Sequence, residues 1–192
     1  KGRSVTAEEL ERALRDDRRE ESYRKAVRWI GRMPRTEAEV RAYLARCGCD
    51  EDARNDIVER LKAGGAIDDE RFSEAWAEQR LYRQRKGSRL IGGELLGKGV
   101  DREIVRRTLS NIGPEDELAS ALALARKRWP RLAAEEDRRA AVRKLYAYLA
   151  RRGFAEEAVR GAVRAALQEA GGDGEREGAA RGGGIDEWFF GD

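Results

Sequence analysis

Arginine and lysine side chains are concentrated in two stretches of the chain, residues 80–107 and 126–152. The first stretch carries nine Lys or Arg residues against three acidic ones and the second ten against three, which gives net charges of +6 and +7. The whole chain has a formal net charge of only +3. Guanidinium and ammonium groups bind phosphates and carboxylates, so the pattern predicts contact with a polyanion or an acidic protein surface. The excess of arginine, 33 residues against seven lysines, is explained as well by a GC-rich genome as by such contacts.

Groups that commonly perform catalysis are absent or have a structural explanation. The 192-residue sequence contains no histidine, and its two cysteines, Cys47 and Cys49, are too few for a structural zinc site. The glycine pair at 92–93 does not follow a strand, which argues against a phosphate loop. The aspartates at 68–69 are interpreted as a helix cap and not as paired acids. We therefore expect a protein that is not an enzyme, with no catalytic residue, no cofactor and no metal ion.

The composition predicts an all-α fold. Charged residues and hydrophobic residues each make up 40% of the chain, only three prolines occur, and runs of β-branched residues are absent. Apolar residues recur at spacings of three and four, which gives each helix one narrow apolar face. Two separate helical runs are predicted before Pro34, one after a capping box at Thr6 and one over residues 23–30. A later helix is predicted to end near Pro130.

Three glycines, Gly48, Gly99 and Gly153, mark an internal repeat, since they stand 51 and 54 positions apart. Each fits the position after a helix C-terminus where φ is positive. Apolar residues stand four and eight positions before each glycine; they are Leu44 and Val40, Leu95 and Ile91, and Leu149 and Leu145. A three-helix unit of this size cannot bury its own apolar face, so we expect three tandem three-helix repeats stacked in an elongated, curved array.

The expected organisation, by residue range, is a polar helical extension over 1–22, repeats over 23–65, 66–113 and 114–170, and a tail over 171–192. The tail begins as a Gly-rich stretch, which predicts a flexible linker, and it ends in the acidic and aromatic residues 185–192. This end is interpreted as docking on the same chain or doing nothing, or as a peptide for a partner.

The stretch 66–109 organises the central repeat as a helix, a basic turn over 83–87, a second helix, the sequence Lys-Gly-Val-Asp at 98–101, and a third helix. Stacked repeats would align its basic side chains with those before Gly153, in a stripe that meets phosphates without reading bases. The candidate residues for contact with DNA or with a protein filament are Arg80, Arg83, Arg85, Lys86, Arg89, Lys98, Arg102, Arg106, Arg151 and Arg152.

The same stretch resembles the central repeat of the RecX family. The resemblance lies in Ile67-Asp68-Asp69-Glu70-Arg71-Phe72, Arg80-Leu81, Lys86-Gly87, Arg89, Glu94-Leu95 and Lys98-Gly99-Val100. It extends over residues 24–168 and leaves the tail outside. The glycine pair at 92–93 departs from the family pattern, which usually has long polar residues there, and this puts local rigidity or a contact at that place in doubt.

The resemblance implies a non-enzymatic regulator that binds the filament of RecA recombinase on single- or double-stranded DNA. It further implies inhibition of the recombinase, ATPase and co-protease activities of RecA, and hence a part in DNA repair, recombination and the SOS response. The alternatives are a helical protein that binds nucleic acid without sequence preference and without a recombinase partner, and a structural scaffold.

The expected location is the cytoplasm, and the expected state is a monomer with reduced thiols. There is no signal peptide and no apolar run of about 18 residues, so we expect a soluble protein with no membrane contact. The first residue is Lys1 and not methionine, which is compatible with a missing N-terminal segment.

Overall fold

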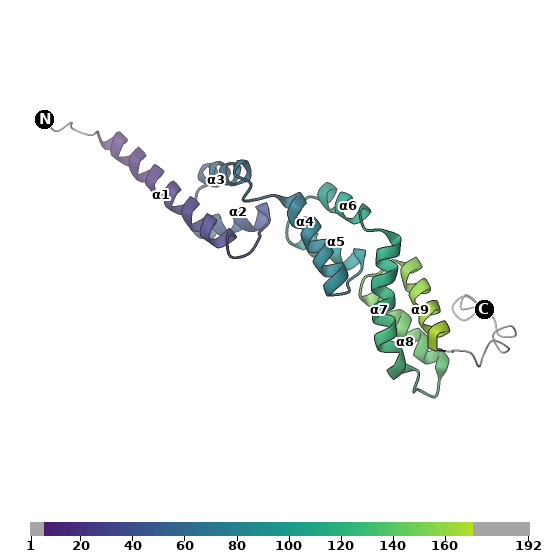
Figure 1. Cartoon of the computed structure of the whole chain (residues 1–192). Coiled ribbons are helices and arrows are strands. Elements are labelled where there is room, and N and C mark those ends of the chain that lie inside the picture. Colours follow the sequence, from purple (N-terminus) through teal and green to yellow (C-terminus); the bar gives the residue numbers. More distant parts are fainter. Residues whose placement is uncertain (1–5, 171–192) are drawn as a thin grey trace. The chain divides into compact units, whose positions relative to one another are not determined.

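The computed structural model describes residues 6–170, and every regular element in this range is a helix (Figure 1). The elements are α1 (Ala7–Ile30), α2 (Glu37–Arg46), α3 (Glu51–Ala63), α4 (Asp69–Glu78), the π-helical turn η1 (Gln79–Arg83), α5 (Ser88–Gly97), α6 (Arg102–Ser110), α7 (Pro114–Leu132), α8 (Arg138–Arg151) and α9 (Glu156–Ala170). The predicted all-α fold is therefore confirmed for the described residues. The predicted linker and aromatic end, within 171–192, lie outside them.

Polar side chains that precede the helices determine where the helices begin. The Thr36 hydroxyl accepts the backbone N–H of Glu39 at 3.2 Å, and the Glu39 carboxylate accepts the backbone N–H of Thr36 at 3.2 Å. The same capping box is present at Thr6. Asp68 accepts the backbone N–H of Arg71 at 2.9 Å, as expected for a cap at the start of α4. These contacts satisfy N–H groups that a helix leaves without a partner in its first turn.

Two predicted helix boundaries are wrong. The two expected runs before Pro34 form the single helix α1, because residues 15–22 contain neither glycine nor proline and an ion pair at 2.8 Å joins Glu21 to Lys25 along the helix. Helix α7 continues past Pro130 to Leu132. Pro130 stands in the last turn, where its missing N–H leaves only one carbonyl without its usual partner.

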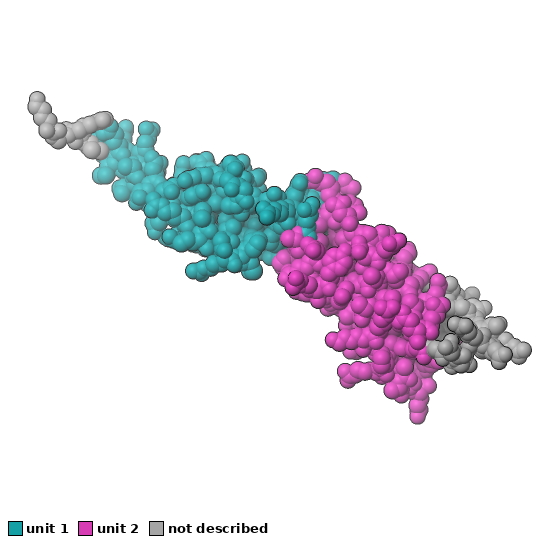
Figure 2. Space-filling model, viewed as in Figure 1, with its two compact units in different colours: residues 1–74, 95–105 teal, residues 75–94, 106–192 magenta. Residues whose placement is uncertain are grey.

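The described part of the chain falls into two compact units, shown in Figure 2. Within the described residues, unit 1 comprises residues 6–74 and 95–105, and unit 2 comprises residues 75–94 and 106–170. Helices α4, α5 and α6 each contribute residues to both units.

The core of unit 1 lies between α1, α2 and α3. Its most deeply buried large side chains are Val40, Leu44, Ile57, Val58 and Leu61. The rings of Trp29 and Tyr43 stack at its border, with centroids 4.5 Å apart. Burial of such apolar side chains stabilises the unit by roughly 1.5–3 kcal/mol for each residue relative to leaving it exposed.

The core of unit 2 lies between α7, α8 and α9, which lie side by side in Figure 1. Helix α7 presents Ala121 and Ala125 to this core, and both are fully buried. Gly161 on α9 faces Leu118 so closely that an added Cβ would lie 2.8 Å from the Leu118 Cδ1 atom. Small residues on the facing helices therefore allow α7 and α9 to approach closely.

The repeat positions read from the sequence are confirmed residue by residue. All six apolar residues that stand four and eight positions before the repeat glycines are fully buried. Gly48, Gly99 and Gly153 have φ angles of 82°, 78° and 84°, which other residues rarely adopt. The same short sequence pattern thus builds the same glycine turn, with positive φ, three times.

Candidate nucleic-acid interface

A turn that ends one helix contacts the beginning of another within unit 1. The Thr36 hydroxyl, just before α2, donates to the carbonyl oxygen of Lys98 at 2.7 Å. An added Cβ at Gly99 would lie 2.4 Å from the Ala38 Cβ atom. The Lys98 ammonium forms an ion pair with Glu39 at 2.8 Å. The turn after α5 is therefore held against the N-terminus of α2.

The corresponding contact recurs within unit 2 at the next pair of repeats. The Gly87 N–H, just before α5, donates to the carbonyl oxygen of Arg152 at 2.9 Å, and the Arg89 N–H donates to that of Gly153 at 3.0 Å. An added Cβ at Gly153 would lie 2.5 Å from the Leu90 Cβ atom. Arg152 and Lys98 thus occupy equivalent places, one residue before a repeat glycine. The basic turn and the α8–α9 turn are therefore held together by backbone hydrogen bonds.

The buried carboxylate of Glu117 fixes this arrangement further. Its Oε1 atom accepts the backbone N–H and the hydroxyl of Ser88, both at 2.9 Å, and the backbone N–H of Ala155 at 3.1 Å. Ser88 begins α5 and Ala155 precedes α9, so one oxygen atom on α7 caps the N-termini of two other helices. A carboxylate is favoured there because helix N-termini carry a partial positive charge.

Two of the candidate cations are bound to an internal carboxylate. The Glu94 carboxylate accepts from the Arg80 Nε atom at 2.8 Å, from the Trp76 indole at 3.0 Å, and from the Lys86 ammonium. The Arg80 guanidinium also lies 3.8 Å from the centre of the Trp76 ring. Burial by itself would raise the pKa of Glu94, but the hydrogen bonds and charges of Lys86 and Arg80 outweigh it and leave that pKa below its ordinary value.

Arg152 is also engaged within the protein. Its guanidinium donates to the carbonyl oxygens of Gln84 and Arg85, the latter at 2.7 Å and 3.1 Å. These carbonyls become accessible because the chain leaves η1 through Arg85, which has a positive φ of 51°. The Arg152 side chain thus stabilises the basic turn, and its sequence position gave no sign of this role.

The other candidate cations are mostly exposed. Arg83 at the end of η1, Arg89 at the start of α5 and Arg151 at the end of α8 flank the joined turns of unit 2. All three are exposed, while Arg85 is half-buried. Arg102 and Arg106, at the two ends of one turn of α6, are exposed as well. Backbone hydrogen bonds join the turn that carries Arg83 and Arg89 to the turn after Arg151. This part of unit 2 can therefore meet several phosphate groups with rigidly anchored arginines.

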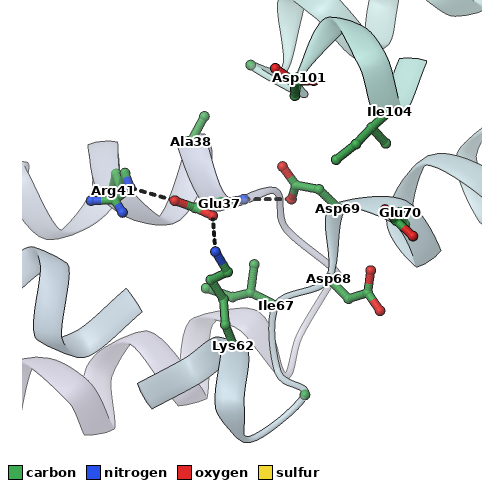
Figure 3. Close-up of a pocket in the computed structure, with 12 residues that line it drawn as sticks. Glu37, Ala38, Arg41, Lys62, Ile67, Asp68, Asp69, Glu70, Asp101 and Ile104 are labelled. Atoms are coloured by element: carbon green, nitrogen blue, oxygen red, sulfur yellow. Dashed lines mark hydrogen bonds and ion pairs between the residues drawn. The ribbon is translucent and has the colours of Figure 1, made fainter. Parts of the chain in front are cut away.

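A second surface feature, a hollow in unit 1, is lined mainly by negatively charged side chains. A hollow of about 700 Å³ between the starts of α2, α4 and α6 is lined by Glu37, Asp68, Asp69, Glu70 and Asp101 against Arg41 and Lys62. Figure 3 shows Arg41 and Lys62 both pointing to Glu37. Burial raises the pKa of Asp69, whose carboxylate accepts the Glu37 backbone N–H at 2.9 Å. This hollow is unsuited to DNA.

No group of acidic, cysteine or histidine residues suited to a metal ion is found within residues 6–170. In the same range, no helix combines the length and the apolar character that crossing a bilayer requires.

In comparisons with known proteins, each of the three repeats is matched by a separate domain of one protein family. Sequence models of the first, second and third three-helix domains of RecX match residues 23–61, 68–109 and 115–163. The regulatory protein RecX of Mycobacterium tuberculosis is 36% identical over 143 residues, which cover 73% of this chain and 82% of that protein. The regulatory protein RecX of Corynebacterium efficiens is 33% identical over 158 residues, which cover 80% of this chain and 75% of that protein.

The fold is also that of solved structures with lower sequence identity. The crystal structure of RecX from Lactobacillus salivarius superposes with a TM-score of 0.74 at 22% identity and covers 79% of this chain and 98% of that one. A second crystal structure of a regulatory protein RecX gives a TM-score of 0.73 at 22% identity. At this level of identity the likeness concerns the fold alone.

Proposed function

This chain belongs to the RecX family, and on that premise we propose that it binds the RecA–DNA filament and inhibits the recombinase, ATPase and co-protease activities of RecA. The observation that carries the proposal is the match of all three three-helix domains of RecX, in order, to this one chain. Regulatory proteins of this name are the relatives found across most of its length. The proposed role is regulation by binding, without chemistry performed on a substrate.

The proposed contact surface is narrower than the ten cations taken together. Arg83, Arg89 and Arg151 are exposed on turns that are tied together, so they can reach phosphates without losing an internal partner. We assign Arg80, Lys86, Lys98 and Arg152 a supporting role, because each already binds an internal carboxylate or carbonyl group. Removing such a group from its partner costs more than a surface contact returns. Arg85, Arg102 and Arg106 remain in the proposed contact set.

The test is the DNA-dependent ATPase of RecA from the same organism, assembled on single-stranded DNA. Adding this protein at a substoichiometric ratio should lower the rate of ATP hydrolysis, since one regulator bound to a filament affects several subunits. A chain with Arg83, Arg89 and Arg151 changed to Glu should inhibit less. The matched control changes three other exposed arginines, Arg12, Arg32 and Arg46, to Glu.

The outcome decides between two readings. Inhibition that the first triple variant weakens and the control retains supports the proposed regulator. Undiminished ATP hydrolysis at every ratio, in the presence of measurable DNA binding, would favour the alternative of a nucleic-acid-binding protein without a recombinase partner.

A further inference from the structure

A hollow of about 500 Å³ opens on unit 2 between the end of α7 and the facing side of α8. Its apolar lining includes Leu132 from α7 and Ala147 and Tyr148 from α8. Ala147 and Tyr148 are only half-buried, so the lining is accessible. Sites of this size and character accept one or two large apolar side chains.

The rim of this hollow is basic. Arg128, Arg143, Lys144 and Arg151 line it against the single carboxylate of Glu135, so the four cations leave a net charge of +3. Lys144 is paired with Glu135 at 2.6 Å. The Arg128 guanidinium lies 5.0 Å from the centre of the Tyr148 ring, over an aromatic face that a partner ring could extend. The occupant that fits is therefore both aromatic and acidic.

One segment of this chain has that chemistry. Residues 185–192 read Ile-Asp-Glu-Trp-Phe-Phe-Gly-Asp, with three adjacent aromatic side chains and three carboxylates. The segment lies outside the described residues, and its side-chain charge of −3 equals the rim charge with opposite sign. The acidic hollow of unit 1 in Figure 3 would repel it.

The segment is also tethered to the chain close to the hollow. Arg126, near the end of α7, binds Glu169 in the last turn of α9 through two hydrogen bonds of 2.6 Å and 2.8 Å. Helix α9 therefore ends beside the end of α7 that carries the hollow (Figure 1). The roughly 14 residues between Ala170 and the segment span at most about 48 Å when extended, whereas α7 is only about 28 Å long.

We propose that residues 185–192 dock in the hollow between α7 and α8, with the aromatic side chains on its apolar lining and the carboxylates on its basic rim. A tethered segment meets its site at an effective concentration on the order of millimolar. A dissociation constant of about 0.1 mM for the free segment would then keep it docked about nine-tenths of the time. Docking would place carboxylates beside Arg151, where they compete with phosphate groups. It concerns this chain alone, so it is tested without RecA or DNA.

The test places a photo-crosslinker in the segment of the full chain. Benzoylphenylalanine replaces Phe189, the dilute protein is irradiated, and the cross-linked peptides are identified by mass spectrometry. We expect adducts within one molecule on residues 128–151. The yield should fall several-fold in the double variant Arg128→Glu and Arg143→Glu, because both side chains are exposed and their reversal removes the complementary charge.

Two further variants separate docking from loss of fold. Ala147→Trp fills the hollow without changing its charge and should lower the yield as much as the double reversal. Arg41→Glu changes a cation of the unit 1 hollow and should leave the yield unchanged. The proposal would be overturned by adducts outside residues 128–151, by adducts only between molecules, or by the absence of adducts. It would also be overturned if the α7–α8 variants left the cross-linking yield unchanged. Circular dichroism of every variant confirms that the helices are retained.

Discussion

Gly87 donates its backbone N–H to the carbonyl oxygen of Arg152 at 2.9 Å, and the place where its side chain would stand is filled by the α8–α9 turn. The donor, Gly87, stands just before α5, which is the second helix of the second repeat. The acceptor, Arg152, stands just before Gly153, the repeat glycine of the third repeat. Thr36 and Lys98 make the equivalent bond in unit 1, with a hydroxyl as the donor. Consecutive repeats are therefore joined in the same way at both places. Each junction depends on the close approach of two backbone segments as much as on the burial of apolar side chains.

Replacing Gly87 by Ala should destabilise unit 2. The added Cβ would lie 2.2 Å from the Phe154 nitrogen and 2.3 Å from the Gly153 carbonyl carbon, and neither backbone atom can turn away. We expect a loss of about 3 kcal/mol or more, measured as a lowered thermal midpoint by circular dichroism. The matched control is Gly93→Ala within α5, where no neighbouring atom lies within 4 Å of the added Cβ. That change should raise stability by about 0.5–1 kcal/mol, and equal effects of the two changes would contradict the junction.

Leu95→Ala should destabilise the protein by about 2–5 kcal/mol, because the side chain is completely buried and its removal leaves a cavity. The next residue provides the control, since Leu96 is 46% exposed. Leu96→Ala should change the unfolding free energy by less than about 0.5 kcal/mol. Urea denaturation of both variants measures the difference, and similar midpoints would mean that the buried face of α5 is wrongly assigned.

Stability should fall in acid partly because of Glu94. Its pKa is lowered in the folded protein, so its contribution is complete above the pKa of the unfolded chain and is lost as the pH falls through the folded value. Glu94→Gln should cost about 1.5–3 kcal/mol at pH 7, where three donors lose a charged acceptor. The variant should also be less sensitive than the natural protein to a change from pH 6 to pH 3.

The comparison uses unfolding free energies from urea titrations at both pH values. Glu136→Gln serves as the control, because Glu136 is an exposed residue of the α7–α8 loop. A Glu94→Gln variant with undiminished pH dependence would show that the carboxylate does not hold Arg80 and Lys86 in solution.

The repeat could be predicted from the sequence because its signals are local. Leu95 and Gly99 stand one helical turn apart: the helical spacing of apolar residues marks the buried face, and the positive φ belongs to the turn that ends the helix. The capping box at Thr6 was predicted for the same reason. The spacing of the three repeat glycines then joined these local elements into three repeats, and the three domain matches agree with it.

The pairing of the charges could not be predicted in the same way. Nothing in the sequence singled out Glu117, yet its carboxylate accepts hydrogen bonds from residues 29 positions earlier and 38 positions later, at the starts of two other helices. Glu94 entered the sequence analysis as part of the family resemblance and as a negative charge among nine positive ones, and neither observation indicated that it binds two of them. Sequence spacing does not show which distant side chains meet, so exposed and engaged cations looked alike.

Changing Arg83, Arg89 and Arg151 to Glu should weaken DNA binding and reduce its dependence on salt. Each phosphate contact contributes a slope of about 0.9 in the logarithmic plot of affinity against salt for duplex DNA, so three lost contacts should lower the slope by about 2.7. Fluorescence anisotropy at several salt concentrations measures it. The triple control at Arg12, Arg32 and Arg46 should keep the original slope if the proposed surface makes the contacts. An unchanged slope in the first variant would mean that its arginines do not touch DNA.

The most direct test of the regulator is its preference for the filament over DNA alone. Labelled protein is titrated with single-stranded DNA and, at the same salt, with the same DNA coated by RecA in the presence of a non-hydrolysable ATP analogue. We expect clearly tighter binding to the coated DNA, with part of that preference retained when Arg83, Arg89 and Arg151 are changed to Glu. Equal or weaker binding to the coated DNA would contradict recognition of the RecA filament.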